Sequence, residues 1–426
     1  MSDGSSTAHL YQPKLVAIFR EGYGAEAFRK DVLAALTVAI VALPLSMAFA
    51  IASGLSPEHG LFAAIVGGFL VSALGGSRYQ IGGPAGAFIV LVSATVTQHG
   101  VAGMLLTVLL SGAMLTLVGL SRLGSLIRHI PHAVTVGFTA GIAIIILASQ
   151  LKDLGGLTLG VAEPGRLLPK LMVLGGALAT LNPAALGIGL GSAALIFLLR
   201  RWRPAWPGML LAVVAASCAA ALLHLPVETI ASRFGALPHG LPRPAMPALS
   251  WALVLAVLPA ALSFTLLGAV ESLLSAKVAD GMTGRKHRSN MELVAQGIAN
   301  IGAALFGAMP VTGTIARTAT NVRAGARSPL SGMMHALFLL LFMLLAAPLM
   351  GFVPLAALAG VLLVVCWYMA EKAEFLRLLR DPPNAAVLLA TFGVTLLRDL
   401  TEGILAGCVL AAVLWLVRRG VPEEDL

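Results

Sequence analysis

Long apolar stretches dominate this chain, and they constrain its fold more than any motif does. Hydrophobic residues make up 58% of the sequence and charged residues only 11%, which is far from the average of soluble proteins. A stretch of roughly 20 apolar residues can cross a bilayer as a helix, and a helix satisfies its own backbone hydrogen bonds in lipid. We therefore predict an all-α polytopic membrane protein surrounded by a lipid bilayer.

Hydropathy divides the chain into fourteen predicted transmembrane segments. Those after Pro84 and Pro310 are too short to cross a hydrocarbon core of about 30 Å. Segments 3 and 10 are therefore predicted to be half-helices, each entered through an extended stretch of chain. The fourteen segments run near residues 32–53, 58–75, 84–97, 101–119, 122–151, 183–199, 207–225, 250–280, 290–308, 311–325, 329–347, 352–370, 383–397 and 402–418.

Lysine and arginine residues predict the orientation, because cytoplasmic loops are enriched in them. If the N-terminus lies inside, most of the 28 Lys and Arg residues fall on the cytoplasmic side, including Arg200, Arg201 and Arg203. Both termini are therefore predicted to be cytoplasmic, with residues 1–30 forming an amphipathic segment there. The net charge of +9 follows from the same asymmetry. Because no polar domain carries a basic surface, we predict no nucleic-acid partner.

Prolines recur in the same order in the two halves of the chain. The corresponding pairs are Pro44 and Pro259, Pro84 and Pro310, and Pro131 and Pro354. Seven segments per half, an odd number, force the second half to insert upside down, so we predict a seven-plus-seven inverted repeat. Pro131 and Pro354 are further expected to bend segments 5 and 12, because proline removes a helical hydrogen bond.

The two half-helices predict an anion-binding site. Their N-terminal ends would meet near the bilayer midplane, each with unpaired N–H groups and a partial charge of roughly +0.5. Arg317, in the first turn of the second half-helix, adds a permanent positive charge. The alternatives are that Arg317 snorkels or pairs internally, and that the small residues serve close helix packing. Those small residues, which would let a ligand approach the backbone, are Gly82, Gly83, Ala85, Gly86, Ala87, Gly313 and Ala316.

Glu271 is the intramembrane carboxylate of the eighth segment. An ionised group at the bilayer centre costs roughly 2.5 to 3.5 kcal/mol, so it is usually paired, hydrated or functional. Glu271 could neutralise Arg317, take up a proton that travels with the anion, or hold Na⁺ with Ser275 and the backbone near Gly313. We favour the proton, because a partly dry site disfavours the charged carboxylate. Apart from this Na⁺ alternative we predict no metal, and we predict no cofactor.

Two ordered runs of residues carry a resemblance to a known family. The first half contains residues 43–50 (LPLSMAFA), 54–62 (GLSPEHGLF), 75–78 (GGSR) and Gly83-Pro84. The second half contains residues 271–276 (ESLLSA), Thr283-Gly284, residues 290–293 (NMEL), Gln296-Gly297, Asn300 and residues 312–318 (TGTIART). Over essentially every segment, the chain resembles the sulfate permease family of anion transporters, whose animal relatives include prestin.

The resemblance implies a core domain that moves against a gate domain in an elevator mechanism. The core would comprise residues 31–121 (segments 1 to 4) and 249–348 (segments 8 to 11), and the gate residues 122–248 (segments 5 to 7) and 349–420 (segments 12 to 14). The anion would lie between the starts of segments 3 and 10, with Glu271 and Ser275 as coupling residues. The implied anion contacts are Ala48, Phe49, Ala85, Gly86, Ala87, Phe88, Thr314, Ile315, Ala316 and Arg317.

The sequence departs from the family pattern in two places. Leu45 stands where many members have Gln after the first-segment proline, which changes the polar lining of the site. Members usually continue into a cytoplasmic STAS domain, whereas only a short cytoplasmic tail, residues 421–426, is expected here. The chain is either shortened or lacks that domain. Because relatives form homodimers largely through it, a homodimeric partner is left open.

The favoured function is proton-coupled symport of a C4-dicarboxylate such as fumarate or succinate across the bacterial inner (plasma) membrane. The first alternative is Na⁺- or proton-coupled uptake of bicarbonate or sulfate. An alternative of another class is an anion channel, or an anion-exchange or voltage-responsive protein. An enzyme is not predicted, because the sequence lacks the His-Glu-x-x-His, Gly-x-Ser-x-Gly and phosphate-loop motifs.

Overall fold

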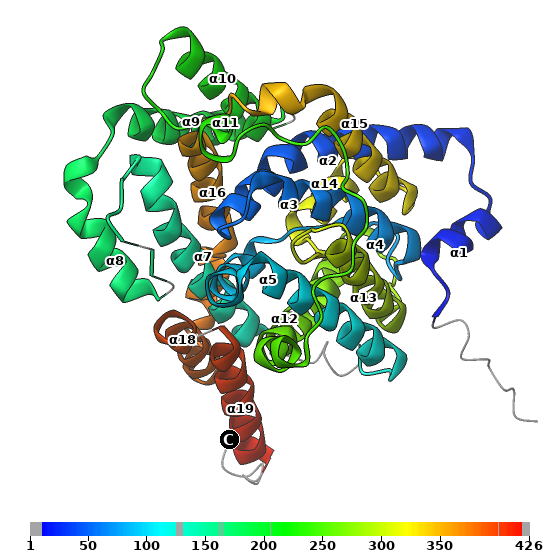
Figure 1. The fold of residues 1–426 in the computed structure, drawn as a ribbon. Helices are drawn as coiled ribbons and strands as arrows, with labels where there is room; N and C mark the ends of the chain where they lie inside the picture. The colour runs from blue at the N-terminus through cyan, green and yellow to red at the C-terminus, as the bar shows by residue number, and fades with distance from the viewer. Residues whose placement is uncertain are drawn as a thin grey trace, which may run out of the picture.

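A computed structural model describes residues 11–124, 131–161, 163–164, 166–204, 206–398 and 400–419, and these residues are mainly helical (Figure 1). The first half contains α1 (Lys14–Glu21), α2 (Ala25–Ala52), α3 (Pro57–Phe62), the π-helical turn η2 (Ala63–Gly67), α4 (Gly68–Leu74), strand β1 (Gly82–Gly83), the 3₁₀ turn η3 (Gly86–Phe88), α5 (Ile89–Leu120), α7 (His132–Gly155), α8 (Leu167–Gly176), η4 (Leu178–Thr180), α9 (Pro183–Trp202), α10 (Gly208–Leu222) and α11 (Ile230–Phe234). The second half contains α12 (Trp251–Thr283), α13 (Ser289–Leu305), strand β2 (Thr312–Gly313), α14 (Ile315–Arg323), α15 (Leu330–Met350), α16 (Leu355–Met369), α17 (Lys372–Leu378), α18 (Pro382–Leu397) and α19 (Leu400–Arg419).

Eight of the described helical runs are long and apolar enough to cross a membrane. They are Ala25–Ala52, Pro57–Leu74, Gly86–Leu120, His132–Gly155, Pro183–Trp202, Trp251–Thr283, Leu330–Met350 and Leu355–Leu378. Shorter apolar helices span Leu167–Gly176, Gly208–Leu222, Pro382–Leu397 and Glu402–Val417. The chain is therefore a helical membrane protein, and the count of fourteen crossings stays a prediction.

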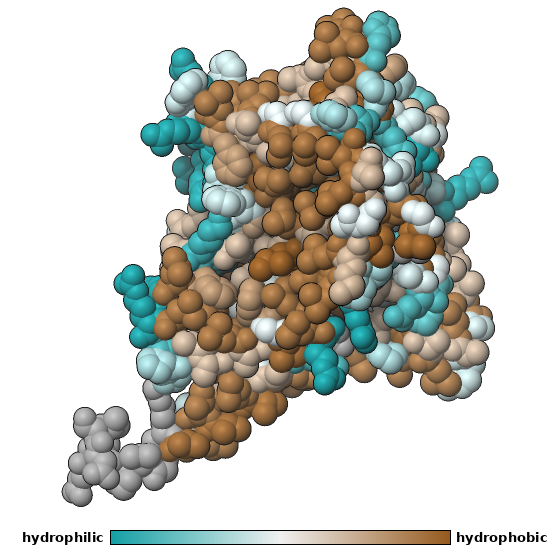
Figure 2. Space-filling view, turned by 90° about the vertical axis from the view of Figure 1, so that its left-hand side faces the viewer, coloured by the Kyte–Doolittle hydropathy of each residue, from teal (hydrophilic) through white to brown (hydrophobic). Residues whose placement is uncertain are grey.

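The outer surface is apolar over a broad area. Figure 2 shows this area on the side where α8 and α9 lie in Figure 1, with hydrophilic residues gathered toward its margins. Leu171 and Met172 of α8 and Leu190 and Leu198 of α9 are all exposed. An apolar surface of this size needs a non-aqueous surrounding, which the hydrocarbon of a bilayer supplies.

A glycine separates the predicted segments 3 and 4. Both lie in the run Gly86–Leu120, but Gly100 has φ 68° and ψ −177°, a conformation that glycine adopts readily. The interruption falls between the predicted ranges 84–97 and 101–119. The other predicted half-helix, α14, spans nine residues, or about 14 Å at 1.5 Å per residue. It is therefore too short to cross the membrane by itself.

The predicted bends at Pro131 and Pro354 are wrong. Both prolines precede a helix, Pro131 as the N-cap of α7 and Pro354 as the N-cap of α16, each with extended backbone angles. Proline fits a helix start because the N–H that it lacks has no helical partner there. The repeat pairs nevertheless share a setting, because Pro44 and Pro259 both lie inside long helices.

Some predicted ranges fall partly outside the described residues. Segment 5 was predicted from residue 122, whereas α7 begins at His132 and residues 125–130 are not described. Of the predicted amphipathic segment 1–30, residues 11–30 are described and contain α1 and the start of α2. The predicted tail, residues 421–426, also lies outside the described residues.

Helices from the two halves intermix in two packed groups. In the first group α5 packs on α12 and α13, while α15 packs on α2 and α4. In the second group α7 packs on α16 and α18, while α9 packs on α10 and α16. Helix α2 also contacts α7, α10 and α16, so it lies at the boundary between the groups. The same pattern of mixing is what an inverted repeat with core and gate domains would require.

Glycines allow α5 and α13 to approach each other closely. A Cβ atom at Gly112 of α5 would lie 2.7 Å from the carbonyl oxygen of Gly297 in α13. A Cβ atom at Gly297 would in turn collide with the side chain of Thr116. Small residues at a crossing are a common way to pack membrane helices, so this contact holds the first group together.

We predict that Gly297→Val destabilises the fold by about 1–3 kcal/mol, because overpacking a tight contact forces the backbones apart. Thermal unfolding in detergent measures the effect. Gly187→Val in α9 is the matched control, since a Cβ atom there meets nothing within 4 Å. Equal losses in the two variants would contradict the close contact between α5 and α13.

Candidate functional site

A short antiparallel ladder joins the two halves of the chain at the start of both half-helices. Gly82 of β1 pairs with Gly313 of β2, and Gly83 pairs with Thr312. The backbone N–H of Thr314 then donates to the carbonyl oxygen of Ile81 over 3.0 Å. The chain passes directly from these strands into η3 with α5 and into α14. The two helix starts therefore lie side by side, as the sequence predicted.

The start of α14 offers unpaired donors beside an exposed residue. The N–H of Thr318 donates to the oxygen of Thr314 over 3.0 Å, so the three preceding N–H groups have no carbonyl within the helix to bond. Ala316 is exposed and Ile315 half-buried, although Thr314 and Arg317 are buried. A helix start with free donors attracts anions, and this one is accessible to a solute.

The start of η3 supplies the matching half of the site. The N–H of Phe88 donates to the oxygen of Ala85 over 3.1 Å, which leaves Gly86 and Ala87 as the first donors of this helical run. The side chains of Ala85, Ala87 and Phe88 are buried. A Cβ atom at Gly86 would lie 3.5 Å from the ring of Phe49 and 3.6 Å from the sulfur of Met369.

Arg317 is buried, with 2% of its surface exposed, so it does not snorkel to the surface. Its Nη2 atom donates to Ser46 Oγ over 3.2 Å, whereas Nε and Nη1 are buried without a hydrogen-bond partner. A Cβ atom at Gly83 would collide with the guanidinium, so the side chain lies directly against β1. A buried cation with two unused donors is costly, and an anion at the helix starts would offset that cost.

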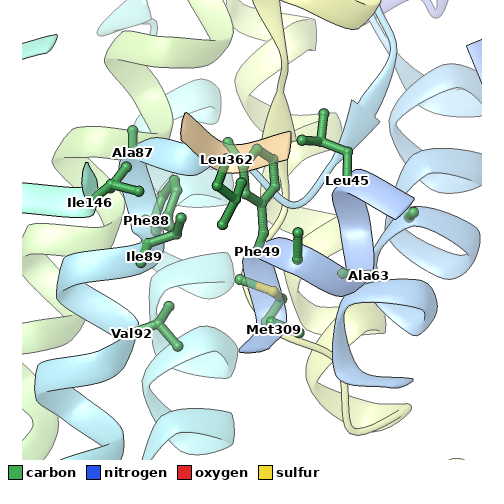
Figure 3. Packing of buried hydrophobic residues seen from close by; sticks show 14 of the residues in the cluster. Leu45, Phe49, Ala63, Ala87, Phe88, Ile89, Val92, Ile146, Met309 and Leu362 are labelled. Carbon is green, nitrogen blue, oxygen red and sulfur yellow. The ribbon is translucent and has the colours of Figure 1, made fainter. Parts of the chain in front are cut away.

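An apolar wall closes the other side of the site. Phe49 and Ala48 of α2 are buried, and Phe88 packs edge to face on Phe264 of α12 with ring centroids 5.5 Å apart. Figure 3 shows Phe49 beside Leu362 of α16, with Phe88 and Ile146 of α7 in the same cluster. The boundary between the two packed groups is therefore apolar where it passes the site.

Glu271 and Ser275 lie on α12 beside the ladder. The Oε2 atom of Glu271 is buried without a partner, and no ion pair within 4 Å joins it to Arg317. Ser275 Oγ donates to Thr318 Oγ1 over 3.1 Å. The predicted role of Glu271 as a direct partner of Arg317 therefore has no support in this conformation, and the proton and Na⁺ roles stay open.

Sequence reasoning missed several polar groups around the ladder. Ser46 and Thr318 stood in the quoted motifs without a role, yet Ser46 holds Arg317 and Thr318 Oγ1 accepts from the N–H of Ile81 over 3.1 Å. Gln80 precedes β1, donates to the oxygen of Ser272 over 3.2 Å and keeps its Oε1 atom unpaired. A buried glutamine next to a Gly-Gly pair in an apolar stretch was the signal that could have revealed it.

Oxygen atoms gather on the α12 side of the ladder. The hydroxyl groups of Ser272 and Thr312 are 2.7 Å apart. Gln80, whose Oε1 atom is unpaired, donates to the carbonyl oxygen of Ser272, and Glu271, whose Oε2 atom is unpaired, precedes Ser272 in the chain. Within the described residues no group of three or more His, Cys, Asp or Glu side chains could hold a metal ion. A weakly bound cation such as Na⁺ would instead depend on these hydroxyl, amide and carboxylate oxygens.

Comparison with known proteins identifies the family. The family model described as the sulfate permease family matches residues 28–391. The chain belongs to the sulfate permease family. It is accordingly an anion transporter, as the motifs around the ladder indicated.

Two curated relatives match over most of their length. YvdB of Bacillus subtilis, named as a candidate sulfate transporter, is 42% identical over 401 residues, which cover 93% of this chain and 75% of that protein. The bicarbonate transporter BicA of Picosynechococcus is 30% identical over 413 residues, covering 93% of this chain and 72% of that protein.

Solved structures share the fold. The transmembrane domain of a cyanobacterial bicarbonate transporter BicA matches with a TM-score of 0.80 at 29% identity, covering 92% of this chain and 98% of that chain. Murine Slc26a9 in the inward-facing state matches with a TM-score of 0.88 at 18% identity, covering 98% of this chain and 73% of that chain. At that lower identity the likeness shows the fold alone.

We predict that Gly83→Ala weakens anion binding at least about tenfold, or about 1.4 kcal/mol, because the new methyl group must displace the guanidinium of Arg317. The shift in unfolding temperature with added sulfate measures the affinity. Gly281→Ala is the control, since a Cβ atom there meets nothing within 4 Å. Unchanged sulfate binding by Gly83→Ala would contradict a role of the guanidinium at this position.

Proposed function

We propose that this protein is a carrier of small oxyanions, with sulfate as the first substrate and bicarbonate as the second. The observation that carries the proposal is the pair of helix starts held together by β1 and β2, with the buried guanidinium of Arg317 beside them. Backbone N–H groups from two directions suit an anion whose oxygens also point in several directions.

The names of the relatives support this order of candidate substrates. The 42% identical relative is named for sulfate, whereas two relatives named for bicarbonate are each 30% identical. The names of the compared relatives give no support to a C4-dicarboxylate, which the sequence alone had favoured. Fumarate therefore serves as the competitor to be tested rather than as the proposed substrate.

Transport is proposed to follow from movement between the two packed groups. The proposed core comprises α2 to α5 and α12 to α15, which hold β1, β2 and Arg317. The proposed gate comprises α7 to α10 and α16 to α19. The apolar contact of Phe49 with Leu362 supports sliding, because among the described residues no ion pair given between side chains joins the two groups. Such movement would make the protein a saturable carrier. We place it in the bacterial plasma membrane, with seven-plus-seven segments and both termini cytoplasmic.

The coupling ion is proposed to bind at Glu271. A carboxyl group with a buried, unpartnered oxygen is more stable as a neutral acid than as a free carboxylate, so a proton is the first candidate. Na⁺ is the second, because Ser275 follows Glu271 by about one turn on α12, and Gln80, whose Oε1 atom is unpaired, donates to Ser272 of the same helix.

We expect purified protein in liposomes to take up radiolabelled sulfate with saturation, and unlabelled bicarbonate to compete. Arg317→Gln should lose at least about 90% of this uptake, because it removes the buried positive charge. Arg323→Gln, at the exposed end of α14, is the control and should retain it. Stronger competition by fumarate than by bicarbonate would contradict the proposed substrate and favour a dicarboxylate. Single-channel currents in a bilayer would contradict a carrier and show that the protein is a channel.

Glu271→Gln should abolish the stimulation of sulfate uptake by an imposed gradient while leaving exchange of sulfate for sulfate in place. The amide mimics a neutral carboxyl group but cannot release a proton or carry the charge that Na⁺ needs. Uptake is measured with a pH gradient and, separately, with a Na⁺ gradient. The gradient that drives the wild type identifies the ion, and full gradient-driven uptake by Glu271→Gln would rule out the coupling role.

A further inference from the structure

His335 in α15 is a buried titratable group that the proposed mechanism leaves unused. Its side chain has no exposed surface, and both ring nitrogens are buried without a hydrogen-bond partner. Buried polar atoms are nearly always hydrogen-bonded, so an exception needs a physical explanation such as a water molecule, an ion or a functional proton. A histidine that served only packing would cost less as a leucine or phenylalanine.

Arg317 reaches the same part of the core from α14. Its guanidinium lies against Gly83 of β1 and donates from Nη2 to Ser46 of α2, the helix on which α15 packs, and it keeps Nε and Nη1 without partners. One turn before His335, Gly332 packs against Ser72 and Ile81, and Ile81 accepts from the N–H of Thr314 at the start of α14. His335 therefore lies on the helix that packs beside the ladder, one turn beyond the contact of Gly332 with Ile81.

Other charges around His335 are few or already engaged. Helix α15 packs on α2, α4 and η2, and neither α4 nor η2 contains a titratable residue. On α2, Asp31 accepts hydrogen bonds from Tyr23 and Ser328 and from the N–H of Arg327. Its partner Ser328 precedes His335 by seven residues, which corresponds to about 10 Å along the helix at 1.5 Å per residue. The remaining charges on α2, Glu26, Arg29 and Lys30, belong to its first two turns, where Arg29 and Glu26 are exposed.

These charges make the state of His335 depend on the occupancy of the site. While the site is empty, a second positive charge beside Arg317 in a dry interior is unfavourable, so the imidazole stays neutral. An anion at the helix starts neutralises Arg317 and removes that repulsion. Protonation of His335 then becomes favourable, and by linkage a protonated His335 must strengthen anion binding by the same factor.

We propose that His335 is an anion-linked proton site: it takes a proton from water when an oxyanion binds beside Arg317 and returns it when the anion leaves. No covalent bond is made or broken apart from the N–H bond on one ring nitrogen. The proposal rests on the proposed binding of an oxyanion at Arg317. It adds a proton site on α15 to the coupling role proposed for Glu271 on α12.

Proton uptake on anion binding tests the proposal. Detergent-solubilised full chain in weakly buffered solution near pH 7 is mixed with sodium sulfate, and a pH indicator reports the protons bound. Wild type should take up protons, whereas His335→Gln should take up fewer than half as many. His239→Gln, which changes an exposed histidine, is the matched control and should behave as wild type.

The pH dependence of sulfate affinity gives a second measurement. One linked proton changes the affinity by up to about tenfold per pH unit, with tighter binding at lower pH, and His335→Gln should flatten that slope. Equal proton uptake and an equal slope in His335→Gln would overturn the inference. Should that variant fail to fold, nitrogen NMR of the histidine rings in the wild type takes its place. If no buried histidine ring becomes protonated when sulfate is added, the inference is overturned. Failure of wild type to bind sulfate would instead refute the proposed function.

Discussion

The pairing of Gly82 and Gly83 with Gly313 and Thr312 is the contact on which the rest of the site depends. Two stretches of extended chain deep in a membrane protein must satisfy their backbone groups without water, and here each satisfies the other. Side chains would prevent the approach, since a Cβ atom at Gly82 would meet Val71 and one at Gly313 would meet Gln80. Because η3 and α14 follow the paired strands within a few residues, the two helical runs must begin next to each other.

Buried charges in this protein fall into two kinds. Asp31 and Glu292 have no exposed surface, yet both are hydrogen-bonded. Asp31 accepts hydrogen bonds from the hydroxyl groups of Tyr23 and Ser328, and Glu292 accepts them from the N–H of Ser77 and the side-chain amide of Gln296. These carboxylates fasten loops to helices. Arg317, Glu271, Gln80 and His335 instead keep unused donors or acceptors. Unsatisfied buried groups are costly, so each of these four needs a physical explanation, and the proposed anion supplies one for Arg317.

Sequence reasoning succeeded where a pattern had one physical solution. Short apolar segments after Pro84 and Pro310 could only be half-helices in lipid, and the second is the nine-residue α14. It failed where one residue type has two settings: Pro131 and Pro354 cap helices rather than bend them, because proline suits a helix start as well as a kink. It also passed over Ser46 and His335, which look like ordinary helix residues until Arg317 from another helix reaches them.

The sequence by itself determined the lipid surrounding, the helical class, the family motifs and two of the buried charged residues, Arg317 and Glu271, because apolar length and charge scarcity act locally along the chain. Only the tertiary structure decided which of those charges share a site. The bond from Arg317 to Ser46 joins residues 271 positions apart, and the pairing of β1 with β2 joins the two halves. Such contacts depend on how helices pack against one another, and no local pattern records that packing.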